Sequence, residues 1–218
     1  MRLCLSCQAG CCRRFNVPIT GYDIIKIRKL LGIEYFYFAS ITPVEEEYLE
    51  KDSKKLALFK LNNIGKYNYY TFYLRSIKSR YAKDTDRCMF LQEWGMEDFL
   101  LPESVDLTAR CGIYQARPLA CTIYPAKLHE NELIGVTKNP SKTIEKPEFR
   151  VYELCPDSLS AEDFKQNSEE LMKNLVLYKY EMNYFKFLSR VWNEGNGDFG
   201  EFFPFLEEGY MNRIAFEE

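Results

Sequence analysis

The sequence predicts an α+β fold, in which a small antiparallel sheet and cysteine-rich irregular loops pack with several helices. Residues 56–61 and 67–74 are apolar and aromatic stretches separated by turn-forming residues, which is the pattern of a β-hairpin. Apolar side chains then recur every three or four residues from Leu171 to Trp192, as in a long C-terminal amphipathic helix. The eight cysteines lie outside both regions, in stretches without a clear period.

The chain of 218 residues has the length of one domain. With 46% hydrophobic and 16% aromatic residues it contains enough apolar side chains for a core. We expect a cysteine-cluster metal-binding domain over residues 1–157 and a helical segment over residues 158–218. The helical segment is expected to pack on the domain, so that both form a single compact unit.

Charge and hydropathy exclude two classes of partner. The formal net charge is −3, which disfavours a general nucleic-acid binder. No run of about 18 apolar residues predicts a membrane span. The N-terminus lacks a basic region followed by an apolar stretch, and Cys4 stands too near the start for a lipoprotein signal to precede it. We therefore expect a cytoplasmic, reducing location.

The first 53 residues predict a loop followed by short helices. Residues 1–16 are interpreted as an irregular knuckle. Residues 20–23 resemble a capping box, and the helix after them should end at Gly32. A short helix is expected over residues 34–39. Pro43 suits the first turn of another helix, because that position needs no backbone N–H.

The middle of the chain predicts strands and long connections. Residues 62–65 form the turn of the hairpin, and residues 92–109 are interpreted as an excursion between two cysteines. Two more strands are expected at 127–136 and 148–154. A helix should start at residues 160–163, and the long helix should end at Gly195 and Gly197. The aromatic tail, with Phe202, Phe203 and Phe205, is expected to dock back onto the fold.

The cysteines are interpreted as metal ligands. In a reducing compartment thiols serve metal binding or redox chemistry more often than structural disulfides. Cys4 and Cys7 have the CxxC spacing that lets two sulfurs converge on one ion. Adjacent Cys11 and Cys12 would need separate disulfide partners on diverging sides of the backbone, which disfavours a disulfide framework. The candidate ligands are Cys4, Cys7, Cys11, Cys12, Cys88, Cys111, Cys121 and Cys155.

The residue types narrow the chemistry. The chain contains one histidine, His129, in an expected strand, so a histidine-based catalytic triad has no supporting motif. Soft thiolates select zinc, cuprous copper or iron–sulfur clusters. The residue types alone leave zinc, cuprous copper and iron–sulfur clusters open.

Arginines accompany the cysteines. Six of the twelve arginines lie within four residues of a cysteine, whereas none of the seventeen lysines does: Arg2, Arg13, Arg14, Arg87, Arg110 and Arg117. Guanidinium groups are weakly hydrated and suit a partly dry, anionic thiolate site. Tyr114 and Tyr124 each follow a cysteine by three residues. The candidates for contacts with the bound group are Arg13, Arg110, Tyr114, Arg117 and Tyr124.

The ordered motif resembles a known family. The CxxCxxxCC run over residues 4–12, then Cys88-Met-Phe-Leu, residues 111–125 and Cys155-Pro are similar to the YkgJ-type cysteine-cluster family of zinc- or iron-chelating domains. The stretch from Cys88 to Cys111 is longer than the compact spacing usual in that family. The resemblance implies metal binding by the cysteines.

A more distant resemblance concerns chemistry. Flagellin lysine N-methylase carries a similar cysteine cluster, which implies S-adenosylmethionine-dependent methyl transfer with an iron–sulfur cluster. The chain has no glycine-rich fingerprint for that co-substrate. The enzymatic status, the protein or small-molecule substrate and the reaction therefore stay open at this point.

Three functions compete. The first is a cytosolic protein that holds iron or an iron–sulfur cluster and supports methyl-transfer or redox chemistry. The second is a non-catalytic zinc protein, structural or for storage, with closed tetrahedral sites. The third is a thiol redox sensor that uses Cys11 and Cys12. The metal is expected where the N-terminal knuckle meets the Cys111–Cys121 segment and Cys155.

Overall fold

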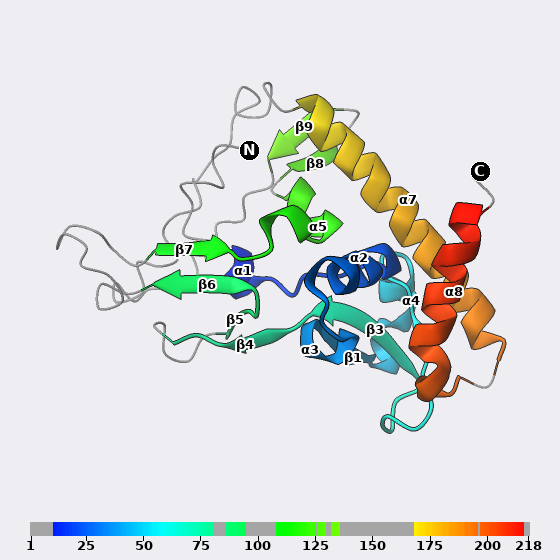
Figure 1. The fold of residues 1–218 in the computed structure, drawn as a ribbon. Helices are drawn as coiled ribbons and strands as arrows, with labels where there is room; N and C mark the ends of the chain where they lie inside the picture. Colours follow the sequence, from blue (N-terminus) through cyan, green and yellow to red (C-terminus); the bar gives the residue numbers. More distant parts are fainter. Residues whose placement is uncertain are drawn as a thin grey trace. The chain divides into compact units, whose positions relative to one another are not determined.

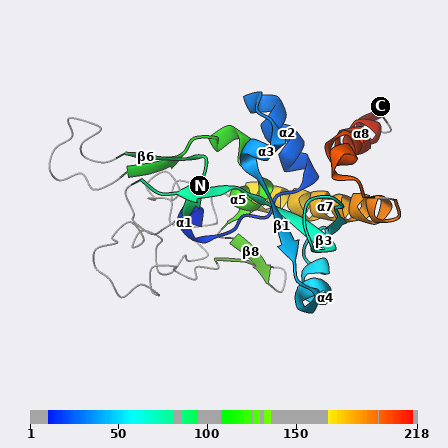
Figure 2. The same ribbon diagram turned by 90° about the horizontal axis from the view of Figure 1, so that it is seen from below.

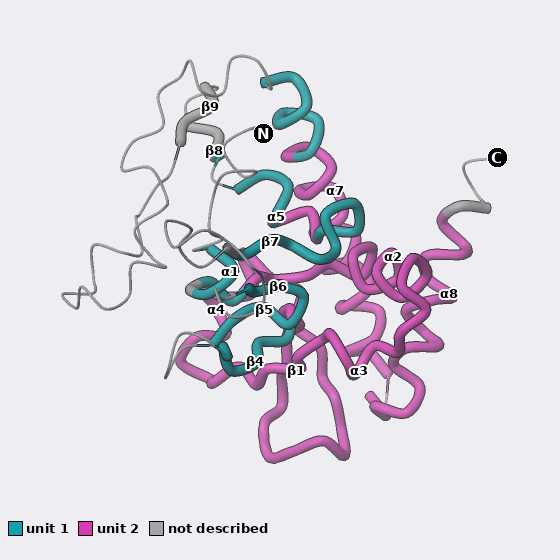
Figure 3. Tube along the Cα trace, turned by 60° about the vertical axis from the view of Figure 1, so that its left-hand side comes forward, with its two compact units in different colours: residues 1–16, 75–117, 121–174 teal, residues 17–74, 118–120, 175–218 magenta. Residues whose placement is uncertain are grey.

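The computed structural model describes residues 11–80, 86–94, 108–124, 126–129, 132–135, 168–195 and 197–215 (Figure 1). The chain divides into two compact units (Figure 3). Unit 1 comprises residues 1–16, 75–117 and 121–174, and unit 2 comprises residues 17–74, 118–120 and 175–218. Helices and antiparallel strands occur together, so the predicted α+β class is confirmed. Among the described residues, no helix combines the length and the apolar character needed to cross a membrane.

Unit 2 is built on a three-stranded antiparallel sheet in the order β1-β3-β2. Its strands are β1 (Ala39–Val44), β2 (Phe59–Lys60) and β3 (Tyr69–Leu74). The predicted hairpin is confirmed as the β2–β3 pair, with Phe59 opposite Tyr70. The turn between them includes Asn63 at a positive φ of 69°, which asparagine tolerates better than most residues.

Strand β1 was not predicted from the sequence. Pro43 lies in β1 opposite Tyr70, so its placement in the first turn of a helix was wrong. Because β1 is at the edge of the sheet, a residue without a backbone N–H is tolerated there. The helical turns come later, at η2 (Glu46–Tyr48) and α4 (Leu49–Ser53). Figure 2 shows β1 beside β3, with α4 following it.

The predicted capping box is confirmed at helix α2 (Gly21–Leu31). The Thr20 hydroxyl accepts a hydrogen bond from the Asp23 backbone N–H, and the Asp23 carboxylate accepts one from the Thr20 backbone N–H. The helix ends at Gly32, as predicted, with a left-handed φ of 63°. The short helix α3 (Tyr35–Phe38) confirms the next prediction.

The long helix is α7 (Ser168–Asn193), and its predicted end near Gly195 is confirmed. The helix starts in unit 1 and continues through unit 2. After the single turn η7 (Phe199–Glu201), helix α8 (Phe202–Ala215) folds back beside α7 (Figure 1). Tyr184 on α7 donates to the Gly209 carbonyl on α8 across 2.6 Å.

The aromatic tail completes the core of unit 2, as predicted. Phe202 is fully buried and stacks on Phe72 of β3, with ring centroids 4.9 Å apart. Phe59 and Trp192 contact the same ring edge to face. Phe203 stacks on Tyr35 at 4.0 Å, and Phe205 contacts Trp192. The sheet and the two long helices of this unit therefore share one aromatic core.

Unit 1 consists of short ladders and turns. Strand β4 (Ser76–Lys78) pairs with β5 (Asp86–Cys88), β6 (Leu91–Trp94) with β7 (Thr108–Cys111), and β8 (Ala126–His129) with β9 (Glu132–Gly135). Its described helical segments are α1 (Cys11–Arg14), η4 (Tyr114–Ala116), part of α5 (Leu119–Ile123) and the first turns of α7.

Three expectations for unit 1 differ from the structure. Residues 11–14 form a helical turn rather than an irregular loop, closed by the Phe15 N–H on the Cys11 carbonyl. The excursion over residues 92–109 begins and ends as paired strands. The single strand expected at 127–136 is a hairpin. The strand at 148–154, the helix start at 160–163 and the boundary at residue 157 lie outside the described residues.

Candidate metal centre

Five of the eight candidate ligands lie in the described part of unit 1. Cys11 and Cys12 are on α1, Cys88 ends β5, Cys111 ends β7 and Cys121 is on α5. All five are half-buried thiols that form no disulfide. Cys4, Cys7 and Cys155 lie outside the described residues.

The strand connections account for the positions of Cys88 and Cys111. A two-residue turn follows Cys88, and the chain then enters β6 at Leu91, which pairs with Cys111. The Gly112 N–H donates to the carbonyl of Phe90, in that turn, across 2.8 Å. A Cβ at position 112 would lie 3.0 Å from the same oxygen, so glycine permits this close approach.

Helix α1 packs against β5, and this brings Cys11 and Cys12 close to Cys88 at the end of that strand. The pKa of Cys12 is raised well above its usual value by a hydrogen bond with Cys11 and by burial. The charges of Cys11, Cys88 and Cys121 raise it further. These four thiols, from three separate segments of the chain, are therefore close enough to interact electrostatically.

Burial also shifts the pKa values of Cys88 and Cys111. Burial raises the pKa of Cys88 to about 11, and the charges of Cys111 and Cys11 add to this effect. Burial also raises the pKa of Cys111, whereas the Arg117 charge lowers it. Clustered thiols in these surroundings resist ionisation on their own. A bound cation reverses this balance, because metal binding deprotonates its thiol ligands.

The described thiols do not form a finished coordination shell. Within the described ranges, no three Cys, His, Asp or Glu side chains are positioned together to hold one ion. The described cysteines thus supply a cluster of soft donors in one unit, and three further candidate ligands belong to the sequence outside those ranges.

The buried carboxylate of Glu93 pairs with two arginines in unit 1. Glu93 on β6 accepts a hydrogen bond from Arg13, and its other oxygen lies 2.9 Å from Nε of Arg87. The Ser79 hydroxyl donates to the same carboxylate across 2.9 Å. The side chains of Arg13 and Glu93 are 0% and 1% exposed. Two arginines against one glutamate leave one net positive charge within this buried group.

Two nitrogen atoms of the Arg13 guanidinium have no acceptor among the described residues. Its Nε and Nη2 are buried and have no hydrogen-bond partner among the described residues. Buried donors without a partner are costly, so such atoms call for an acceptor. Sulfur ligands of a bound metal are anionic acceptors, and Arg13 directly follows Cys12. The charge and the donors of this group therefore fit a thiolate-bound metal.

A family model matches residues 3–152, and its description reads "CxxCxxCC: Putative zinc- or iron-chelating domain". The match covers more than half of the chain. The chain belongs to the CxxCxxCC family. Searches of curated proteins and of solved structures found no significant match. Family membership supports metal binding by the cysteine cluster and leaves the choice between zinc and iron open.

The chain departs from the motif in the family's name. Three residues, 8–10, separate Cys7 from Cys11, where CxxCxxCC has two. The CxxCxxCC match includes the first seven cysteines and ends before Cys155. Cys155 is therefore the candidate ligand with the least support from the family.

The residues predicted to contact the bound group differ in their burial and in their partners. Arg117 lies over the Tyr114 ring, 3.8 Å from its centroid, and Nε of Arg117 donates to the Tyr114 carbonyl. Tyr114 and Arg110 are exposed on the surface of unit 1. The half-buried Tyr124 contacts the ring of Phe15 at 5.3 Å. Arg117 acts on Cys111 through its charge, and Arg13 takes part in the buried group around Glu93.

Sequence reasoning missed Glu93. It lies in the stretch interpreted as an excursion, and nothing in its local sequence marks it as buried. The need for a carboxylate here follows from the burial of Arg13 and Arg87, which the sequence does not reveal.

Proposed function

We propose that this protein binds iron through its clustered cysteine thiolates, either as iron alone or as an iron–sulfur cluster. The observation that supports this most is the electrostatic coupling of five thiols from four elements of unit 1. Five proposed ligands lie in the described part of the chain: Cys11, Cys12, Cys88, Cys111 and Cys121. The other three candidates are Cys4, Cys7 and Cys155.

The surroundings of the thiols support a charged, partly buried metal group. Four thiolates on a divalent ion carry a net charge of about −2, which needs neighbouring cations when water is scarce. Arg13 and Arg87 provide them, each next in sequence to a cysteine and both held by Glu93. When bound, an iron–sulfur cluster supplies one-electron chemistry, and the residues of this chain bind and neutralise it.

Zinc is the second candidate. The family description names zinc beside iron, and thiolates form closed tetrahedral zinc sites. A thiol redox sensor has less support, because its attacking cysteine needs a lowered pKa and the pKa of Cys12 is raised.

Metal and acid-labile sulfide analysis of protein purified without oxygen tests this proposal. Iron with sulfide and a brown absorption spectrum is expected for a cluster, and iron without sulfide for an iron site. Colourless protein with stoichiometric zinc would support the second candidate. Protein without any metal after anaerobic purification and after reconstitution with iron or zinc would contradict metal binding.

The chemistry supported by the metal is a separate question. A methyl-transfer role predicts binding of S-adenosylmethionine to iron-loaded protein, measured by calorimetry, and a redox role predicts reversible bleaching of the chromophore by dithionite. Loaded protein that shows neither response would be consistent with storage or a structural role.

A further inference from the structure

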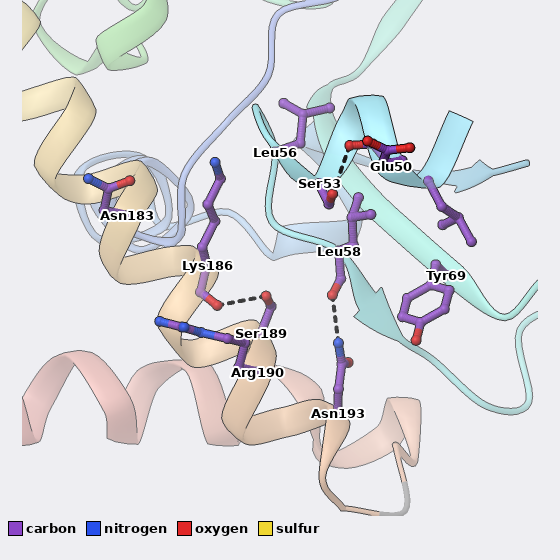
Figure 4. Close-up of a pocket in the computed structure, with 11 residues that line it drawn as sticks. Glu50, Ser53, Leu56, Leu58, Tyr69, Asn183, Lys186, Ser189, Arg190 and Asn193 are labelled. Atoms are coloured by element: carbon purple, nitrogen blue, oxygen red, sulfur yellow. Dashed lines mark hydrogen bonds between the residues drawn. The ribbon is translucent and has the colours of Figure 1, made fainter. Parts of the chain in front are cut away.

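A pocket of about 660 Å³ lies in unit 2, and none of its lining residues is a candidate metal ligand (Figure 4). Its lining comes from α4 and the chain after it, from β3 and from α7. Small-molecule sites commonly measure roughly 300–1,000 Å³.

One side of the pocket is apolar. Leu49, Leu56 and Leu58 line it together with the ring of Tyr69. Figure 4 shows Leu56, Leu58 and Tyr69 across from α7. An apolar or aromatic body is the ligand part that such a surface favours.

The polar groups of the wall are mostly engaged by the wall itself. Asn193 donates to the Leu58 carbonyl and accepts from the Lys60 N–H. Ser189 donates to the Lys186 carbonyl, and Ser53 to the Glu50 carbonyl. The Asn193 contacts join α7 to the chain around β2, whereas each serine contact lies within its own helix, and few neutral groups remain for a ligand.

The two cationic lining residues, Lys186 and Arg190, keep donors available for a ligand. Nζ of Lys186 donates to the Lys54 carbonyl at 2.6 Å, and two N–H donors of the ammonium remain. Neither Lys186 nor Arg190 has a carboxylate partner among the described residues. Burial lowers the pKa of Lys186, as expected for a partly desolvated ammonium without a counter-ion.

The other charges leave the pocket positive. The one acidic lining residue, Glu50, is paired with Lys54 at 2.8 Å. Nζ of Lys60 lies 5.8 Å from the centroid of the Tyr69 ring. Lys186 and Arg190 are four residues apart and therefore stand on successive turns of α7.

We propose that this pocket binds a small organic anion, with its acidic group at Lys186 and Arg190 and its apolar body against Leu56, Leu58 and Tyr69. The same cations would recognise a carboxylate or a phosphate. None of the lining residues is a candidate metal ligand, so anion binding here does not depend on whether the protein binds a metal.

The probe is 1-anilinonaphthalene-8-sulfonate, an aromatic anion whose fluorescence rises in apolar sites, added to the metal-loaded protein. N-phenyl-1-naphthylamine is its uncharged counterpart. We expect saturable binding of one sulfonate per chain. Lys186→Gln should weaken the sulfonate about tenfold and leave the uncharged probe within twofold. Lys179→Gln, an exposed lysine on the same helix, is the matched control and should change neither.

Arg190→Gln is a second variant, at an exposed position where folding is not at risk, and should weaken the sulfonate by a smaller factor. Competition then distinguishes the acidic groups, because 2-naphthoate reports a carboxylate and 2-naphthyl phosphate a phosphate. Displacement by either supports the proposal. It is overturned if the sulfonate does not saturate, if Lys186→Gln leaves its affinity unchanged, or if Lys179→Gln weakens it equally.

Discussion

Glu93 holds Arg13 through a buried hydrogen-bonded ion pair, and Arg13 directly follows Cys12 in the chain. The other oxygen of the same carboxylate faces Arg87, which directly precedes Cys88. One acidic side chain on β6 thus connects the two backbone segments that present these cysteines. The order of the proposed metal centre therefore depends on a residue that is not itself a candidate ligand.

Replacing Glu93 with Gln should leave the arginines of unit 1 buried without their counter-charge. Removing one partner of a buried pair costs about 3–5 kcal/mol, so the free energy of unfolding should fall by that order. Chemical denaturation of the metal-loaded variant measures this loss, and equilibrium dialysis should show weaker metal retention. Glu50→Gln, which breaks the exposed pair with Lys54, should change stability by less than about 1 kcal/mol. Equal, small effects of both variants would show that Glu93 is not such a support.

Much of unit 2 could be predicted from the sequence, because its signals are local. The capping box at Thr20, the glycine stop at Gly32 and the apolar period of α7 each reflect contacts within a few residues. The pairing of β1 with β3 could not be predicted in this way. It depends on an edge position that tolerates Pro43, and such a position is defined only by the completed sheet.

The candidate site was predictable in its residue types and not in its arrangement. Cysteine spacing made the thiols candidate ligands, and the arginines beside them made Arg13 a candidate for contact with the bound group. The contact between Arg13 and Glu93 spans 80 residues of sequence, and no periodic pattern encodes a contact of that range. The role of Gly112 is similar, because its need for a bare Cα arises from the Phe90 carbonyl in a neighbouring turn.

Cys111→Ser and Cys121→Ser should each lower metal content and thermal stability together. Binding free energy at a structural metal site is partly folding free energy, so a lost ligand affects both quantities. Elemental analysis and thermal unfolding of the same preparations check this. Ser189→Ala, in unit 2, is the control and should keep the full metal content. Unchanged metal stoichiometry in both cysteine variants would remove these two residues from the set of essential ligands.

Asp23→Ala should destabilise unit 2 strongly. The buried carboxylate accepts hydrogen bonds from the backbone N–H groups of Thr20, at 3.0 Å, and Leu119, at 2.8 Å. Leaving these buried donors without an acceptor should lower the free energy of unfolding by about 2–4 kcal/mol, measured by urea denaturation. Asp86→Ala, which removes only an exposed pair with Lys78, should cost less than about 1 kcal/mol. A loss at Asp23 no larger than that at Asp86 would contradict this assignment.

Tyr178 should make the protein sensitive to alkali. Burial raises the pKa of its phenol to about 12, and the charges of Asp23 and Tyr73 add to the shift. The unfolded chain loses this proton near pH 10, so between about pH 10 and 12 it binds fewer protons than the folded chain. The contribution of Tyr178 to stability is therefore present below pH 10 and falls by about 2–3 kcal/mol as the pH rises to 12.

The matched variant for this titration is Tyr178→Phe, which keeps the ring and removes the ionisable hydroxyl. Urea denaturation of both proteins at intervals from pH 7 to pH 11.5 gives the difference between their free energies of unfolding. That difference should be constant up to about pH 9.5 and should then move in favour of the phenylalanine variant. Tyrosines that do not interact with Tyr178 titrate in both proteins and cancel in the comparison, whereas Tyr73 belongs to the measured effect because its charge acts on Tyr178. A difference that stays constant throughout the alkaline range would mean that the Tyr178 hydroxyl ionises as readily in the folded chain as in the unfolded one.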